Sequence, residues 1–125
     1  MSQNNIPNRP TIAVDFDGVI HRYSEGWKDG TIYDTYVPGF FRWWFEMQPH
    51  FRVVIISSRF VDDTAIQRAR AWLSLRYADA VECGEIPEDN DTFQVFQKGI
   101  EMSKEKPPAW ITIDDRALRL SLIHI

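Results

Sequence analysis

The sequence predicts an α/β fold with a mostly parallel sheet, and two observations support that prediction. Short apolar segments rich in β-branched residues alternate along the chain with segments of helical spacing. Three apolar segments end in polar side chains, namely Asp15 and Asp17, Ser57 and Ser58, and Asp114 and Asp115. Ligands bind beyond the carboxyl ends of parallel strands, and unrelated surface turns have no reason to share that placement. We therefore expect one site at this edge of the sheet.

The elements of the first half alternate as such a fold requires. The apolar, β-branched run at 11–16 predicts a strand, and the polar stretch at 21–34, which contains Gly26 and Gly30, indicates a loop or a small β-hairpin flap. Pro38 and Gly39 open a helix over 40–47, which Pro49 stops. A second strand is expected over 51–56.

The second half continues the alternation. Asp62 or Asp63 can cap a long helix that reaches about Tyr77, because apolar side chains recur on one side of it. The remaining expected elements are a short strand at 80–83, an acidic loop at 84–91, a helix at 92–102 whose apolar residues also alternate as in a strand, a turn at 104–108 and a strand at 109–113. Together they predict a Rossmann-like three-layer sandwich, with a sheet covered on both faces.

Composition indicates one globular domain and excludes several classes of protein. The 125 residues are 44% hydrophobic and 26% charged, with a net charge of −4 and no dense Lys/Arg block, which argues against a dedicated duplex-binding protein. The single Cys83 rules out an internal disulfide and suits a reducing cytoplasm. The polar residues 1–9, expected to be flexible, have no apolar stretch of a signal peptide, and no run approaches membrane-spanning length.

The acidic pair Asp15 and Asp17 can carry phosphoryl chemistry. A carboxylate attacks phosphorus poorly unless cations screen the repulsion, and Mg²⁺ takes oxygen ligands. Those ligands can come from Asp15, from a backbone carbonyl near Asp17, and from Asp114 or Asp115. Asp15 is then the nucleophile that forms an aspartyl-phosphate, while Asp17 protonates the leaving oxygen and later activates water. Ser57 and a lysine would hold the phosphoryl oxygens.

This pattern resembles the phosphatase branch of the haloacid dehalogenase (HAD) superfamily. The matching segments, in the family's order, are Asp15-Phe16-Asp17-Gly18-Val19, Val53-Val54-Ile55-Ile56-Ser57, Lys106-Pro107-Pro108 and Ile113-Asp114-Asp115. The resemblance spans roughly residues 11–119 and is strongest to small bacterial and phage proteins. It implies a Mg²⁺-dependent phosphohydrolase with Asp15 as nucleophile, Asp17 as acid/base, Ser57 and Lys106 as phosphate binders, Asp114 as metal ligand and Asp115 as a second or alternative ligand.

Several assignments keep rivals. Ser58 competes with Ser57, and Lys104 and Lys98 compete with Lys106. Arg59 is expected to contact substrate, although an arginine at a helix start is often a surface cation. Tryptophans 43, 44, 72 and 110 are read as core aromatics, whereas Trp27 can line a substrate mouth. His21 is read as a hydrogen-bonded loop residue that can approach the site.

The size of the chain limits the substrate and its surroundings. Neither the flap nor the stretch between Ser57 and Lys106 has room for a separate cap domain, so the site should be open. In the superfamily that the chain resembles, an open site goes with bulky substrates or with a cap supplied by a partner chain, so an oligomer is possible. The expected substrate is a small-molecule or polymer-end phosphate ester. We expect one domain over 1–119. The last residues, 120–125, match a translated sequencing adaptor, so we expect a non-native tail on a truncated chain; a genuine apolar tail docked on the sheet is the alternative.

Two other functional classes fit parts of the pattern. A non-catalytic phosphate- or metal-binding domain would keep the same fold, yet would not need an acid/base at Asp17. A receiver domain also uses Asp, Ser or Thr, and Lys around Mg²⁺. Its acidic pair comes early and its phosphoacceptor later in the chain, whereas here the Asp-x-Asp comes first and the Asp114-Asp115 pair last.

Overall fold

A computed structural model describes residues 9–114 and 118–120 of the chain. The elements, in chain order, are β1 (Thr11–Asp15), α1 (Phe40–Met47), β2 (Arg52–Ile56), α2 (Asp63–Glu82), α3 (Asn90–Gly99), β3 (Glu101–Ser103), β4 (Ile111–Ile113) and β5 (Leu118–Leu120). Asp115 and residues 121–125 of the expected tail lie outside the described residues, whereas Leu120 belongs to β5.

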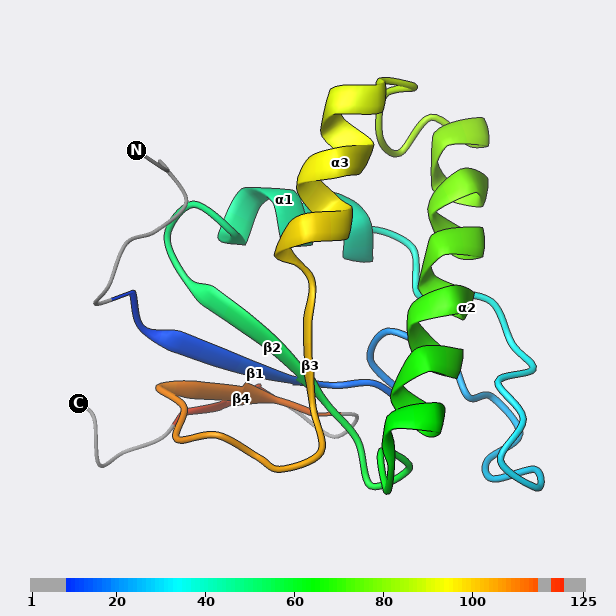
Figure 1. Cartoon of the computed structure of the whole chain (residues 1–125), viewed down its shortest axis with the longest axis vertical. Helices are drawn as coiled ribbons and strands as arrows, with labels where there is room; N and C mark the ends of the chain where they lie inside the picture. Colours follow the sequence, from blue (N-terminus) through cyan, green and yellow to red (C-terminus); the bar gives the residue numbers. More distant parts are fainter. Residues whose placement is uncertain (1–8, 115–117, 121–125) are drawn as a thin grey trace.

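The strands form one sheet in the order β3-β2-β1-β4-β5 (Figure 1). β1 pairs in parallel with both β2 and β4, and β2 pairs in parallel with β3, while β5 is antiparallel to β4. Four parallel strands and three helices among the described residues confirm the predicted α/β class, and the order is consistent with a Rossmann-like fold. The chain steps outward from β1 to β3 and then returns to the other side of β1, so the strand order changes direction between β1 and β4.

All three helices contribute to one core on the same face of the sheet. The buried cluster joins Phe41 and Trp44 of α1, Leu73 of α2 and Phe96 of α3 to alternate strand residues such as Val14 and Ile55. Right-handed crossovers that step in one direction place their helices on one face, and β1-α1-β2 and β2-α2-α3-β3 both step toward β3. The helical side chains therefore cover one face only.

The connection from β3 to β4 reaches the opposite face of the sheet, where Lys104 and Lys106 line a cavity with Ile56 and Thr112. This connection reverses direction across the sheet, has only seven residues, 104–110, and includes Pro107 and Pro108, so it has neither the length nor the backbone donors for a helix. Ala13 and Val54 are buried on this face, at 0% and 2% exposure. The second helical layer of the predicted three-layer sandwich is thus absent from the described residues.

The predicted strand at 80–83 is wrong, because α2 continues through it to Glu82. The buried residues Ala69, Leu73, Tyr77 and Ala80 follow one another three or four positions apart, so Ala80 extends the buried side of the helix rather than starting a strand. The third strand is β3 instead. The helical reading of 92–102 is correct only as far as Gly99, and the chain turns extended at Ile100 before Glu101 pairs with β2.

The flap between Asp17 and Gly39 is an irregular loop rather than a hairpin. Its backbone makes only isolated bridges, from His21 to Asp17 and to Tyr36. Left-handed backbone at Tyr23, Gly26, Asp29 and Gly30 bends the loop repeatedly, which prevents a regular ladder. The loop is nevertheless anchored, because His21 is fully buried beneath it.

Among the described helices, none is both long and apolar enough to cross a bilayer.

Candidate functional site

A cavity of about 310 Å³ lies at the carboxyl ends of the parallel strands. Its lining brings together polar residues that are far apart in the sequence: Asp15, Ser57, Ser58, Lys104, Lys106 and Asp114. These are the side chains that the sequence placed after the first, second and last predicted strands, together with two of the three candidate lysines. The cavity lies on the face of the sheet opposite the helices, because Ile56 and Thr112 also line it.

The register of the sheet explains why Asp15 and Asp114 meet. Val14 of β1 is aligned with Ile113 of β4, so the next residue of each strand is a carboxylate at the same level of the sheet. On the other side of β1, Asp15 is aligned with Ile56, and Ser57 follows directly. The site therefore lies where the strand order changes direction, which is where open α/β sheets bind ligands.

The donor set at this cavity fits Mg²⁺. The ion prefers oxygen ligands, keeps several waters and is usually held by one or two carboxylates together with substrate phosphates. Asp15 and Asp114 supply two carboxylates in one cavity. No group of three or more His, Cys, Asp or Glu side chains with metal-binding placement occurs among residues 9–114 and 118–120, and Asp115, the further expected ligand, lies outside them.

Asp17 is not among the residues that line this cavity, and it is held by two other side chains. Arg59 donates from Nε to Oδ2 at 2.8 Å and from an Nη to Oδ1 at 2.9 Å, while Nδ1 of His21 is 2.8 Å from Oδ1. The Ser57 hydroxyl lies 3.5 Å from Oδ2, at the long limit of a hydrogen bond. Burial alone would raise the pKa of the Asp17 carboxyl, but the bonds from His21 and Arg59 lower it overall. This carboxylate is therefore held in its ionised form.

The imidazole of His21 has a defined tautomer. Nε2 accepts from the backbone N–H of Asp34 at 3.0 Å, so Nδ1 carries the hydrogen and donates it to Asp17. The ring is fully buried and packs edge-on against Trp72 and against Tyr33, with centroid separations of 5.4 and 5.3 Å. The sequence interpretation of His21 as a hydrogen-bonded loop residue is confirmed, although it did not identify Asp17 as the partner. Its position four residues after Asp17, directly beyond a tight turn, is the signal that could have linked the two.

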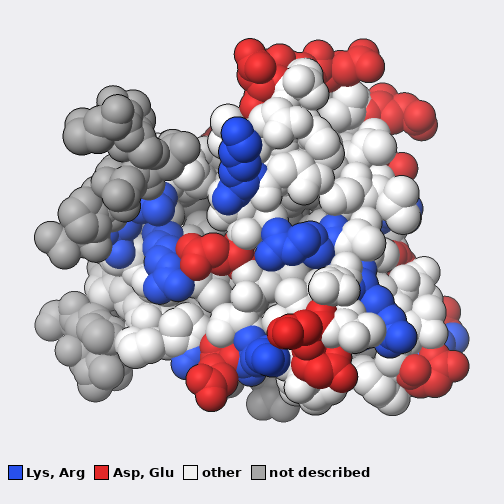
Figure 2. Space-filling model, viewed as in Figure 1, with Lys and Arg blue, Asp and Glu red and all other residues white. Residues whose placement is uncertain are grey.

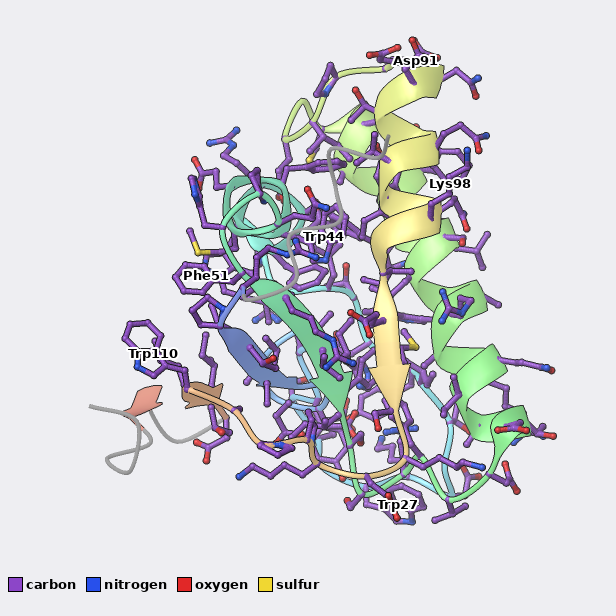
Figure 3. The ribbon with its side chains drawn as sticks, turned by 60° about the vertical axis from the view of Figure 1, so that its left-hand side comes forward. Trp27, Trp44, Phe51, Asp91, Lys98 and Trp110 are labelled. Carbon is purple, nitrogen blue, oxygen red and sulfur yellow. The ribbon has the colours of Figure 1, made fainter. Side chains whose placement is uncertain are left out.

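The candidate lysines separate in space. Lys104 and Lys106 line the cavity with Asp15, and Lys104 also pairs with Asp63 at 3.2 Å. Lys98 lies on α3 and lines a different cavity near Trp44. Figure 3 shows Lys98 well away from the end of the molecule to which the β3 arrow points. Of the three, Lys98 is the one that the fold does not bring to the site.

Arg59 is buried rather than a surface cation, with an exposed fraction of 8%. Besides its two bonds to Asp17, it donates to the carbonyl oxygen of Gly30 in the flap at 2.9 Å. Its guanidinium carbon lies 5.8 Å from the Phe16 ring centroid and 5.3 Å from that of Trp27. Arg59 therefore connects the flap to Asp17 and, in this arrangement, is not presented to the cavity that holds Asp15.

The charged surface is mixed on the face seen in Figure 2. Lys and Arg side chains are interspersed with Asp and Glu, and acidic side chains gather at the end where Figure 1 places the loop between α2 and α3. That loop and the start of α3 carry the exposed Glu88, Asp89 and Asp91. This face thus differs from the continuous basic surface that duplex-binding proteins present.

Comparisons with known proteins add no relative: no protein-family model matches the chain, and neither curated proteins nor solved structures gave a match.

Proposed function

We propose that this chain is a Mg²⁺-dependent phosphohydrolase of the HAD type, which cleaves a phosphate monoester through an aspartyl-phosphate on Asp15. The observation that carries the proposal is the shared cavity of Asp15, Ser57, Lys106 and Asp114 at the switch in strand order. A nucleophile, a hydroxyl donor, a cation and a second carboxylate are the groups that such a reaction needs within reach of one phosphoryl group. A small-molecule or polymer-end phosphate ester in the cytoplasm is the proposed substrate class.

Each residue has a distinct role in the proposed reaction. An oxygen of Asp15 forms a bond to phosphorus as the bond to the leaving oxygen breaks, and that oxygen takes a proton from Asp17. Ser57 and Lys106 hold the phosphoryl oxygens, with Lys104 as a second cation at the same cavity. Asp15 and Asp114 would hold Mg²⁺, which when bound offsets the negative charge of the phosphoryl group. Ionised Asp17 then accepts a proton from the water that hydrolyses the aspartyl-phosphate.

The bonds around Asp17 favour one half of this cycle. A carboxylate with a lowered pKa suits the second step, in which it acts as a base. The first step needs a protonated carboxyl, and Arg59 and His21 oppose that form. The same bonds support a second candidate function, a non-catalytic domain that binds phosphate or metal, in which Asp17 serves only to hold the flap.

Phosphate release from p-nitrophenyl phosphate in the presence of Mg²⁺ tests the proposal. We expect turnover by the unaltered chain and a fall of at least about a thousandfold in kcat for Asp15→Asn, because the nucleophile is lost. Asp91→Asn is the matched control. It changes an exposed aspartate on α3, which Figure 3 shows at the end of the molecule far from Trp27, and it should retain full activity.

The binding alternative makes a different prediction in the same assay. A chain that binds inorganic phosphate and Mg²⁺ by calorimetry, but releases no phosphate from a broad panel of monoesters, would overturn the hydrolase proposal. Equal turnover by Asp15→Asn and the unaltered chain would show that the activity belongs to a contaminant.

A further inference from the structure

Trp27 is an exposed aromatic side chain in the flap beside the proposed site. It is 60% exposed, and Val61, which follows the second strand, is 77% exposed. Both line a cavity of about 310 Å³ whose other members include Arg59, Ile32 and Arg68. Figure 3 shows Trp27 at the end of the molecule to which the β3 arrow points. Two large apolar side chains thus share one cavity and remain open to solvent, an arrangement typical of a binding surface.

The indole of Trp27 is held in place from below. The guanidinium of Arg59 stacks against it at 5.3 Å, and the same guanidinium makes two bonds to Asp17 and one to the Gly30 carbonyl. A Cβ at Gly30 would meet the indole at 3.6 Å, so the ring also packs closely on the flap backbone. Trp27 therefore contacts the same guanidinium that binds Asp17.

The proposed chemistry determines which part of a substrate reaches this cavity. Asp17 protonates the leaving oxygen, so the leaving group must extend from the Asp15 cavity toward Asp17. Lys104 and Lys106 lie at the phosphoryl end, where they line the Asp15 cavity. Beyond Asp17 come Arg59 and then Trp27. The leaving group, and not the phosphoryl group, is the part that meets the indole.

We propose that Trp27 stacks on a planar aromatic ring in the leaving group of the substrate, as in a nucleoside monophosphate. This inference rests on the proposed phosphohydrolase function and narrows its substrate class. The cavity beside the exposed indole is also lined by the apolar side chains of Val61 and Ile32 and by polar groups of Arg68, Thr64 and Asp62. Stacking on an aromatic side chain is worth about 1–3 kcal/mol per base.

Adenosine 5′-monophosphate and ribose 5-phosphate test the stacking directly, because they share the phosphate and the leaving alkoxide and differ by the base. We expect kcat/KM to favour the nucleotide by at least about fivefold in the unaltered chain. Trp27→Ala should reduce that ratio to about one, and Trp27→Phe should keep part of it. Leu75→Ala, which removes another exposed apolar side chain, on α2 and outside the Trp27 cavity, should leave the ratio and both rates as they were. In the Asp15→Asn variant, calorimetry should show the same preference as a lower dissociation constant for adenosine 5′-monophosphate than for ribose 5-phosphate.

The possible failures can be told apart. If neither ester nor p-nitrophenyl phosphate is hydrolysed, the phosphohydrolase proposal fails; the dissociation constants of Asp15→Asn still decide the stacking. Equal efficiency for the two esters in the unaltered chain would overturn the stacking alone. If Trp27→Ala lowered kcat/KM by the same factor for both esters, the stacking would also be overturned, since Trp27 would then act only by supporting Arg59. A Trp27→Ala variant that changes sedimentation but not the ratio would assign the surface to a second copy of the chain.

Discussion

Asp17 and Arg59 show how a single pair of residues links the flap to the sheet. The carboxylate is bound by the fork of Arg59, by His21 and more weakly by Ser57, and the Arg59 side chain is only 5% exposed. Two bonds from one guanidinium give both charge compensation and a fixed orientation, which a lysine cannot reproduce. The pair therefore contributes to stability and to the position of Asp17 at once.

Arg59→Lys tests the contribution of this pair to stability. We expect the free energy of unfolding at pH 7 to fall by about 1–3 kcal/mol, because one ammonium replaces three directed bonds. The folded pKa of Asp17 lies below its ordinary value of 3.8, so its bonds stabilise the fold above the unfolded pKa and lose that effect as the pH falls through the folded pKa. The difference between the two proteins should therefore shrink below about pH 4. Urea unfolding at pH 7 and pH 3 measures it.

Arg22→Lys, at an exposed flap position, is the control for this measurement and should change stability by less than about 0.5 kcal/mol. A loss for Arg59→Lys that is the same at both pH values would contradict the assignment to Asp17.

At the scale of elements, α1 depends on a cap from elsewhere in the chain. Its N-cap residue Gly39 has no side chain to offer, and no acidic residue lies in its first turn. Glu85, in the loop after α2, instead accepts from the backbone N–H groups of Gly39 at 2.8 Å and Phe41 at 3.0 Å, and from the Tyr36 hydroxyl at 3.1 Å. A carboxylate at this position also complements the helix dipole. The end of α2 thus stabilises the start of α1.

Glu85→Ala should lower the free energy of unfolding by about 1–2 kcal/mol, because it leaves backbone donors at the start of α1 without their acceptor. Chemical denaturation measures the change, and unfolding should remain one cooperative transition. Glu88→Ala is the matched control, since Glu88 is exposed in the same loop and should change stability by less than about 0.5 kcal/mol. Equal losses for both variants would show that general loop charge, and not the cap, is responsible.

At the scale of the whole molecule, the order of the strands creates the site. β1 lies between β2 and β4, so residues from three separate parts of the chain meet at its carboxyl end. The 104–110 connection brings Lys104 and Lys106 to the cavity. A ligand bound there would contact β1, β4 and this connection together, and would stabilise their association.

Mg²⁺ should therefore raise the melting temperature of the chain, and chelation should reverse the effect. At a concentration of about 100 times its dissociation constant, the gain in stability is expected to be about 2.7 kcal/mol. Asp114→Asn should remove most of this gain, whereas Asp91→Asn should keep it. Differential scanning calorimetry with and without Mg²⁺ measures the shift. An undiminished gain in Asp114→Asn would place the metal elsewhere.

Much of the fold could be predicted from local pattern because the strongest signals are local. The strand ending at Asp15, the helix α1 and the Asp62 cap of α2 each follow from periodicity or from a capping residue within a few positions. Residues 80–83 do not follow from local pattern, because a short apolar run has the same appearance in a strand and at the end of a buried helix. The helix prevails because Ala80 completes a packed face that includes Tyr77 and Leu73.

The sequence by itself determined the α/β class and the chemical types at the strand ends, because alternation of apolar runs and polar turns depends only on neighbouring residues. Only the tertiary structure decided which lysines lie beside Asp15, that Arg59 turns inward to Asp17, and that His21 donates to the same carboxylate. It also decided that all described helices share one face of the sheet. Each of these depends on strand order and on contacts between distant segments, which no local pattern encodes.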